Sequence, residues 1–207
     1  GNTDETNINY NGTHRKANVS TKLSVTKRDL STVNVTIPAQ TGSQDGKPIT
    51  IDTSKLTFTD KTTGETLALS GDVKVEAPSN AINKGTYTAT ISASDSTDNV
   101  TGETTATFNI VAADLSSAAF KNESTITSTC KAYTGEQITF TTDELGALVD
   151  VNGNVIDPSL YEITFGENIN AKYGDTSEGV IIVKGLGSFE GSEKRVYFDI
   201  TPASLDK

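Results

Sequence analysis

Side chains that carry oxygen ligands alternate along one short segment in the second half of the chain. Asp150, Asn152 and Asn154 occupy alternate positions, and Asp157 follows them. Proteins bind Ca²⁺ with about six to eight such oxygens. The segment lacks the complete spacing of a calcium loop, and Asn152-Gly153 between two apolar runs is a strong hairpin signal. A turn is therefore the favoured interpretation, and a metal site at these positions is the alternative.

The loop at residues 171–178 combines one aromatic side chain with several hydrogen-bonding groups. This combination is the minimum for a weak contact with a sugar or a protein. The candidate ligand-binding residues of the loop are Lys172, Tyr173, Asp175 and Glu178. Two nearby aromatic residues, Tyr161 and Phe189, are expected to pack in the core or in a hairpin.

The composition gives little support to catalysis. A Ser-His-Asp or Cys-His arrangement needs a base of near-neutral pKa, and the chain has one histidine, His14, and one cysteine, Cys130. His14 is expected on an exposed loop or strand, and Cys130 is expected to be a small, partly buried residue with no cysteine partner in the chain. Gly185, Gly187 and Gly191 suggest a phosphate loop, but no helix follows them, so tight hairpin turns explain them better. The sequence predicts no enzyme and no cofactor.

The charge balance excludes one class of partner. The formal net charge is −10 at pH 7, and the isoelectric point is about 4.5. Nucleic-acid binding needs clustered Lys and Arg, whereas Lys27-Arg28 and Lys194-Arg195 are isolated pairs. The chain also has no apolar run long enough to span a membrane. We therefore expect no nucleic-acid partner and no membrane insertion.

Alternation of apolar and polar residues predicts strands in both halves of the chain. It is clearest at residues 33–37, 56–58, 87–91 and 105–110. This is the period of a half-buried strand, and threonine on the outer face is a good strand former. Turn residues recur about every 8 to 15 positions, which is typical of an antiparallel β-sandwich. The one helical turn that we expect lies within residues 142–148, with Thr142 as its cap.

One short pattern occurs three times and divides the chain into units. Its copies end at Leu30, Leu115 and Leu205, at intervals of 85 and 90 residues. A fixed period of this size indicates a repeated small β domain. The predicted units are the last hairpin of a preceding repeat at residues 1–28, repeat 1 at residues 29–113 and repeat 2 at residues 114–207. The junctions between them contain no glycine, so we expect a semi-rigid, extended line.

The alternation also predicts which residues form the core. Because successive side chains of a strand point to opposite faces, Asn109 should face outward between two inward neighbours. The expected inward residues are Tyr87, Ile91, Phe108 and Ile110 in repeat 1, and Tyr161, Ile163, Ile181, Val183, Phe198 and Ile200 in repeat 2.

Repeat 2 resembles a known family. GLGSFEG at residues 185–191 precedes a last strand that reads FDITPASL at residues 198–205, and YTG at residues 133–135 and LYEITF at residues 160–165 come earlier. This series resembles the bacterial immunoglobulin-like tandem repeats of large cell-surface and adhesin proteins of Gram-positive gut anaerobes. Repeat 1 departs from the pattern, because residues 92–99 replace the glycine hairpin. The resemblance implies an all-β fold of tandem immunoglobulin-like antiparallel β-sandwiches and an extracellular location at the cell surface.

The sequence therefore favours a non-enzymatic structural spacer or stalk of a bacterial cell-surface or adhesion protein. Its expected partners are neighbouring immunoglobulin-like domains of the same polypeptide. The alternative is a ligand-binding adhesin module, with a glycan or a host surface protein as partner. A spacer should have similar surfaces in both repeats, whereas a binding module should concentrate its differences in one loop set. The insertion at residues 171–178 is where the two repeats differ most in sequence.

Overall fold

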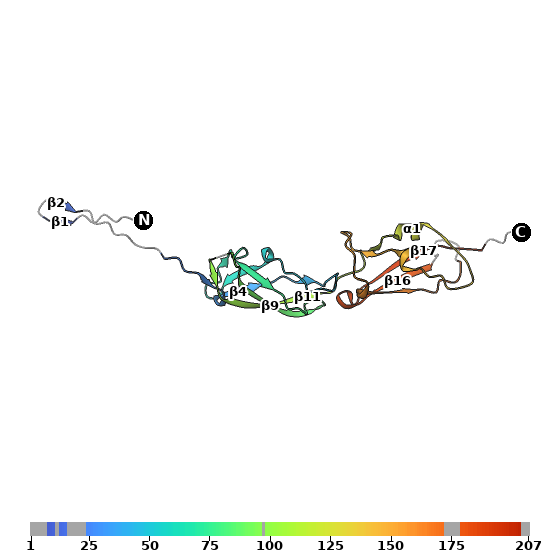
Figure 1. Cartoon of the computed structure of the whole chain (residues 1–207), viewed down its shortest axis with the longest axis horizontal. Helices are drawn as coiled ribbons and strands as arrows, with labels where there is room; N and C mark the ends of the chain where they lie inside the picture. The colour runs from blue at the N-terminus through green and yellow to red at the C-terminus, as the bar shows by residue number, and fades with distance from the viewer. Residues whose placement is uncertain (1–7, 11–12, 16–23, 97, 172–178, 204–207) are drawn as a thin grey trace.

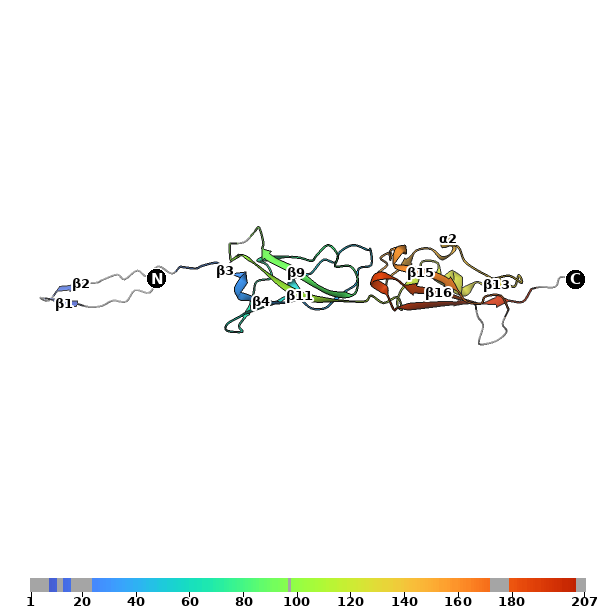
Figure 2. The same cartoon turned by 90° about the horizontal axis from the view of Figure 1, so that it is seen from below.

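Two β-rich bodies lie end to end along the long axis of the molecule (Figure 1), and the same arrangement is visible after a quarter turn (Figure 2). The computed structural model describes residues 8–10, 13–15, 24–96, 98–171 and 179–203. Strands dominate these residues and helices are short, which confirms the all-β class. The buried apolar side chains form two clusters, one drawn from residues 30–110 and one from residues 113–200.

Repeat 1 contains two sheets and a short strand pair. The larger sheet is ordered β5 (Gln40–Thr41), β11 (Glu103–Val111), β9 (Gly85–Ala93) and β8 (Val73–Glu76). The smaller sheet is ordered β4 (Val33–Thr36), β6 (Thr57–Asp60) and β7 (Thr66–Leu67). The remaining elements are β3 (Arg28–Asp29), its partner β10 (Val100–Thr101), and the 3-10 turns η1 (Leu30–Thr32) and η2 (Thr53–Lys55).

Strands β9 and β11 show why the alternating sequence folds as it does. They pair antiparallel, with Phe108 opposite Tyr87. Phe108 and Ile110 are buried, while the residues between and beside them are exposed. Asn109 is exposed, as predicted, and its side-chain oxygen accepts a hydrogen bond from the Thr86 hydroxyl at 2.8 Å. Hydroxyl-bearing residues thus cover the outer face of this sheet.

Repeat 2 has the corresponding strands and additional helices. Its sheets are β15 (Tyr161–Phe165), β16 (Gly179–Gly185) and β17 (Glu193–Phe198); β13 (Lys131–Ala132) and β18 (Ile200–Thr201); and β12 (Ala119–Phe120) and β14 (Leu148–Val149). Its helical elements are α1 (Glu123–Ser128), α2 (Thr142–Leu145), η3 (Pro158–Leu160) and η4 (Gly187–Phe189).

The helices of repeat 2 correct the sequence-based expectation. Helix α1 was not predicted, because its sequence ESTITS favours strands; burial of Ile126 in the core overrides that preference. Helix α2 begins after Thr141 and not Thr142. The Thr141 hydroxyl accepts a hydrogen bond from the Glu144 N–H at 3.2 Å, and the Glu144 carboxylate accepts one from the Thr141 N–H at 2.8 Å. None of the helices in the described residues has the length and apolar character that a membrane crossing requires.

Short parallel pairs were also not predicted. Among the described strands, β10 pairs with β3, β11 with β5 and β18 with β13 in parallel. Side chains alternate with a period of two in both parallel and antiparallel strands, so the sequence pattern could not show the direction. In each repeat, the last strand therefore runs alongside a short strand from the first part of the same repeat.

The predicted core is largely confirmed. Three inward positions, Tyr87, Tyr161 and Ile163, are only partly buried and pack against the clusters. The buried members of the predicted set are Ile91, Phe108, Ile110, Ile181, Val183, Phe198 and Ile200.

The described part of residues 1–28 contains one hairpin and one strand of repeat 1. Strands β1 (Ile8–Tyr10) and β2 (Thr13–Arg15) pair antiparallel, and His14 lies opposite Asn9. Strand β3 pairs with β10, so Arg28, which the sequence placed in residues 1–28, pairs with a strand of repeat 1.

Candidate functional site

Main-chain hydrogen bonds hold the segment that joins the two repeats. The Gly42 N–H donates to the Val111 carbonyl oxygen at 2.9 Å, and the Ala113 N–H donates to the Ser188 carbonyl oxygen at 2.8 Å. Ala113 is buried, and Leu115 is fully buried in the core of repeat 2. Bonded residues therefore flank Ala112 on both sides, which leaves little of the segment free to rotate.

Asp114 fixes the first turn of repeat 2. Its carboxylate accepts hydrogen bonds from the hydroxyl of Ser116 at 2.7 Å and from the Ser116 N–H at 2.8 Å. These hydrogen bonds hold the pKa of Asp114 below its ordinary value. Asp29 makes the same turn at the start of repeat 1, where its carboxylate accepts the Ser31 N–H at 2.9 Å. Both repeats thus begin with the same side-chain cap.

The loop after β5 of repeat 1 contacts two turns of repeat 2. The Ser188 hydroxyl donates a hydrogen bond to the Ser43 carbonyl oxygen, and the Asp157 N–H donates to the Gln44 carbonyl oxygen at 3.0 Å. Ser43 is 7% exposed and Ser188 is 0% exposed. The two groups are thus paired with each other at a place from which water is excluded. The buried serine pair therefore favours one relative placement of the repeats.

Gly42 allows the two repeats to come this close. A Cβ atom at Gly42 would lie 2.8 Å from the Ser188 Cβ and 2.9 Å from the Ser188 carbonyl oxygen. Non-bonded atoms do not approach a Cβ atom this closely, so the contact requires glycine at this position. Tyr133 takes the corresponding place in repeat 2, where its N–H donates to the Thr201 carbonyl oxygen at 2.8 Å. The two repeats therefore differ at this position, with a glycine in repeat 1 and a large aromatic residue in repeat 2.

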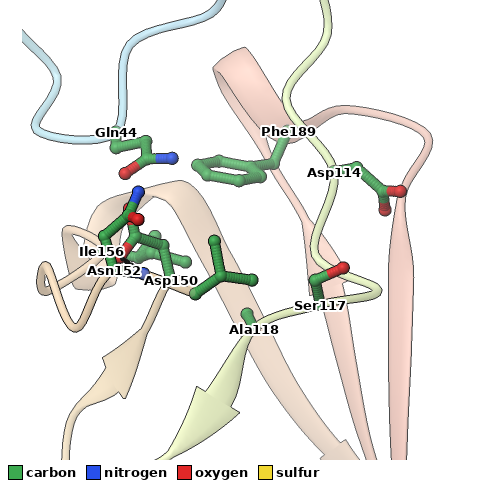
Figure 3. A pocket seen from close by; sticks show the side chains of 9 residues that line it. Gln44, Asp114, Ser117, Ala118, Asp150, Asn152, Ile156 and Phe189 are labelled. Atoms are coloured by element: carbon green, nitrogen blue, oxygen red, sulfur yellow. Dashed lines mark hydrogen bonds between the residues drawn. The ribbon is translucent and has the colours of Figure 1, made fainter.

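A cleft of about 200 Å³ opens beside this contact (Figure 3). Gln44 comes from repeat 1 and lies next to the Phe189 ring of repeat 2 in the figure. The other lining residues all come from repeat 2 and are Asp114, Ser117, Ala118, Asp150, Val151, Asn152 and Ile156. The predicted oxygen-ligand segment thus reaches the junction between the repeats.

The predicted oxygen ligands stabilise the turns in which they lie. The Asp150 carboxylate accepts hydrogen bonds from the N–H groups of Asn152 at 2.9 Å and Asn154 at 2.8 Å. Burial alone would raise the pKa of Asp150, but its hydrogen bonds to Asn154 and Asn152 lower it. Asp157 caps a separate turn by accepting the Ser159 N–H at 2.9 Å. In the described part of the chain, no group of three or more His, Cys, Asp or Glu side chains is placed to hold a metal ion.

The matching turn of repeat 1 has the same chemistry. The Asp60 carboxylate accepts hydrogen bonds from the N–H groups of Thr62 at 2.8 Å and Thr63 at 2.9 Å. Each turn also contains a glycine with positive φ, Gly64 at 73° and Gly153 at 83°. Asp150 therefore has a counterpart that stabilises a turn in the same way.

Lys172, Tyr173, Asp175 and Glu178 lie outside the described residues. Of the other aromatic candidates, Phe189 is 1% exposed and belongs to the core, as predicted. Burial raises the pKa of Tyr161, which also lines a groove of about 320 Å³ beside α2.

No protein-family model matches the sequence, and the comparison with curated proteins found no match.

Sequence reasoning missed the residues that form the junction. GLGSFEG at residues 185–191 pointed to the hairpin that contains Ser188, but not to its partner. Ser43 and Ser188 are 145 positions apart, and no local pattern connects them. The expectation for Cys130 was wrong: it is exposed, because it lies between the end of α1 and β13 and outside the core cluster.

Proposed function

We propose that the chain is a non-enzymatic structural spacer, built from two immunoglobulin-like β-sandwiches in tandem, in the stalk of a bacterial cell-surface or adhesion protein. Clusters shared between sheets support the sandwich. Phe58 of β6 and Phe108 of β11 lie in different sheets but in one buried cluster, and Leu148 of β14 and Phe198 of β17 do so in repeat 2. Two sheets that share an apolar core are the defining feature of a sandwich.

Matching hydrogen bonds support the view that the repeats are copies of one unit. The Arg28 N–H donates to the Asn99 carbonyl oxygen at 2.8 Å, as Ala113 does to Ser188 at 2.8 Å. The two donors are 85 residues apart and the two acceptors 89, close to the period of the sequence pattern. Equivalent contacts at equivalent positions are expected of a duplicated domain.

The hydrogen-bonded segment between the repeats is the main support for the spacer proposal. A hinge would need a flexible linker, whereas this linker is bonded at Val111 and Ala113 and is supported by the Ser43–Ser188 contact. A stalk must keep its units in line to hold a distant domain away from the cell surface. The hydrogen-bonded linker between these repeats fits that requirement.

The parallel strand pairs are also suited to tension. When a chain is pulled at both ends, the pairs β5–β11 and β13–β18 are loaded along the strand direction. Their hydrogen bonds lie across that direction and must be broken together, not one at a time. This geometry resists extension of each repeat.

Small-angle scattering and NMR relaxation test the spacer directly. We expect a particle with two resolved lobes and a radius of gyration well above the ~17 Å of a compact protein of this length, and both repeats should tumble as one elongated body. Gly42→Val should push Ser188 away, so that the repeats tumble separately while each stays folded. Gly71→Val is the matched control, because a Cβ at Gly71 meets nothing within 4 Å. A compact wild-type particle, or separate tumbling without the substitution, would contradict the proposal.

A further inference from the structure

Strand β15 forms an open edge of its sheet. Among the described strands, the order is β15-β16-β17, and β15 pairs with β16 alone. The Leu186 N–H donates to the Leu160 carbonyl oxygen at 2.8 Å, and the Gly166 N–H donates to the Val180 carbonyl oxygen at 3.0 Å. Bonded and non-bonded pairs alternate along an antiparallel ladder. The main-chain groups of Tyr161, Ile163 and Phe165 therefore point away from β16, toward the open edge.

An apolar groove of about 320 Å³ runs beside this edge. Tyr161 and Ile163, whose main-chain groups face the edge, also line the groove with their side chains. The remaining lining residues come from α2, the segment after it and the start of η3, and are Thr142, Leu145, Gly146, Ala147 and Pro158. Main-chain groups with no partner among the described strands and an apolar groove thus occur at the same place, and an added strand can use both.

The same edge in repeat 1 differs. There η2 packs against β8, and the small buried side chain of Val73 stands at the position of Tyr161. Repeat 2 also has one residue more between Leu145 and Leu148 than repeat 1 has between Leu56 and Phe58. The larger side chain and the longer connection separate α2 from β15, which accounts for the groove in repeat 2.

Exposed acidic residues are next to lining residues in the sequence, and Glu162 lies on the opposite face of β15 from Tyr161 and Ile163, across from Lys184 of β16. Asp143, Asp157 and Glu162 are each adjacent in sequence to a lining residue, and Asp143 and Glu162 are exposed. Lys121 is the basic residue closest to Gly146, with its Cβ 3.1 Å from a Cβ built there. Acidic side chains beside a strand edge attract a cationic segment and repel a second copy of the same edge. The charge therefore selects a basic partner over self-association.

We propose that β15 and its groove bind an extended peptide strand of a partner protein in which Lys or Arg alternates with apolar residues. The strand pairs with the main-chain groups of Tyr161 and Ile163 and places an apolar side chain in the groove, while its basic side chains lie near Asp143 and Glu162. This site adds an interaction to repeat 2 and does not depend on the spacer function.

A nine-residue peptide of alternating Lys and Val is the probe, added to the whole chain at physiological salt. We expect saturable changes in the amide NMR signals of residues 142–147 and 161–165, and slower hydrogen exchange at the Ile163 amide. A Glu/Val peptide should not bind. A Lys/Val peptide of equal charge with a central proline should not bind either, because proline lacks the donor that strand pairing needs.

Charge variants distinguish binding at β15 from non-specific attraction of a basic peptide to an acidic protein. Asp143→Lys with Glu162→Lys should weaken binding of the Lys/Val peptide by roughly tenfold or more. Glu65→Lys with Glu76→Lys makes the same charge change on repeat 1 and should have a much smaller effect. The proposal is overturned by equal weakening in both variants, by equal binding of the proline peptide, or by the absence of saturable signal changes up to millimolar peptide. It is also overturned if sedimentation without peptide shows a dimer that protects the Ile163 amide, because the occupant is then a second copy.

Discussion

The two repeats differ most clearly at the residue that precedes their common first turn. In repeat 1 this residue is Arg28, whose Nη1 atom lies 2.6 Å from a carboxylate oxygen of Asp60. In repeat 2 it is Ala113, which is buried in the junction beside the Ser188 hairpin. Arg28 forms an ion pair with Asp60 within repeat 1, whereas Ala113 belongs to the buried apolar cluster of repeat 2. The two repeats therefore use the same position for a polar contact in one case and for core packing in the other.

The outer faces of the main sheets differ as well. In repeat 1 this face presents exposed Thr86, Thr88 and Thr107. In repeat 2 the neighbouring strands present partly buried Val180 and Tyr197, which is 52% exposed. Uniform surfaces were the expectation for a pure spacer. The same face of repeat 2 also carries the exposed charges of Lys184, Glu193 and Arg195, so the two outer faces differ in composition.

Removing the central aromatic of each repeat should have the largest effect. Phe198 packs edge-on against Phe140 at 4.9 Å between ring centres, and Phe108 packs against Tyr87 at 5.9 Å. Phe198→Ala and Phe108→Ala should each cost about 3 to 5 kcal/mol. Hydrogen exchange monitored residue by residue should locate each loss in the mutated repeat. Equal loss of protection in both repeats would show that the two cores unfold as one unit.

Adding a methyl group to one strand glycine of each repeat should give a smaller difference in stability between the repeats. A Cβ at Gly179 would lie 2.1 Å from the Cζ atom of Phe198, whereas a Cβ at Gly85 comes no closer than 3.2 Å to the Tyr87 ring. Gly179→Ala should therefore destabilise repeat 2 by about 1 to 3 kcal/mol, and Gly85→Ala should change stability by less than about 0.5 kcal/mol. Urea unfolding measures both. Phe198→Leu should recover part of the loss in the Gly179 variant, and no recovery would place the strain elsewhere.

Acid sensitivity should give the smallest difference, because ion pairs and hydrogen bonds near the surface contribute little to stability. Hydrogen bonds from the Thr63 and Thr62 N–H groups, and then from Arg28, lower the pKa of Asp60 to about 2. The Thr141 N–H, and then Lys131, lower the pKa of Glu144 to about 2. Both values are depressed on folding, so each carboxylate stabilises its repeat above about pH 4, and this contribution is lost as the pH falls toward 2.

The two carboxylates can be removed independently. Asp60→Asn should reduce the acid sensitivity of repeat 1 alone, and Glu144→Gln should do the same for repeat 2 alone. Amide exchange at about pH 2.5 and pH 5 reports each repeat separately, with exposed Asp95→Asn as the charge control. A change that appears equally in both repeats would argue against independent sites.

The sequence predicted those parts of the structure that depend on local alternation. Strands β9 and β11 and their buried residues could be predicted from a period of two, because a strand with one buried face has alternating apolar and polar residues in its sequence. Helix α1 did not, since its residues favour strands and only the contact of Ile126 with the core makes a helix preferable. The contact between Ser43 and Ser188 could not be predicted either, because a junction between domains leaves no periodic pattern.

The difference between Gly42 and Tyr133 restricts how such units can be recombined. If a gene duplication placed a second copy of repeat 2 after the first, Tyr133 would meet a serine that tolerates no side chain at that position. The two copies would fold but could not adopt the alignment of repeats 1 and 2. A unit with the Ser188 hairpin would then align only with a preceding unit that has glycine at the position of Gly42. The order of domains along the chain would be under selection as well as their number.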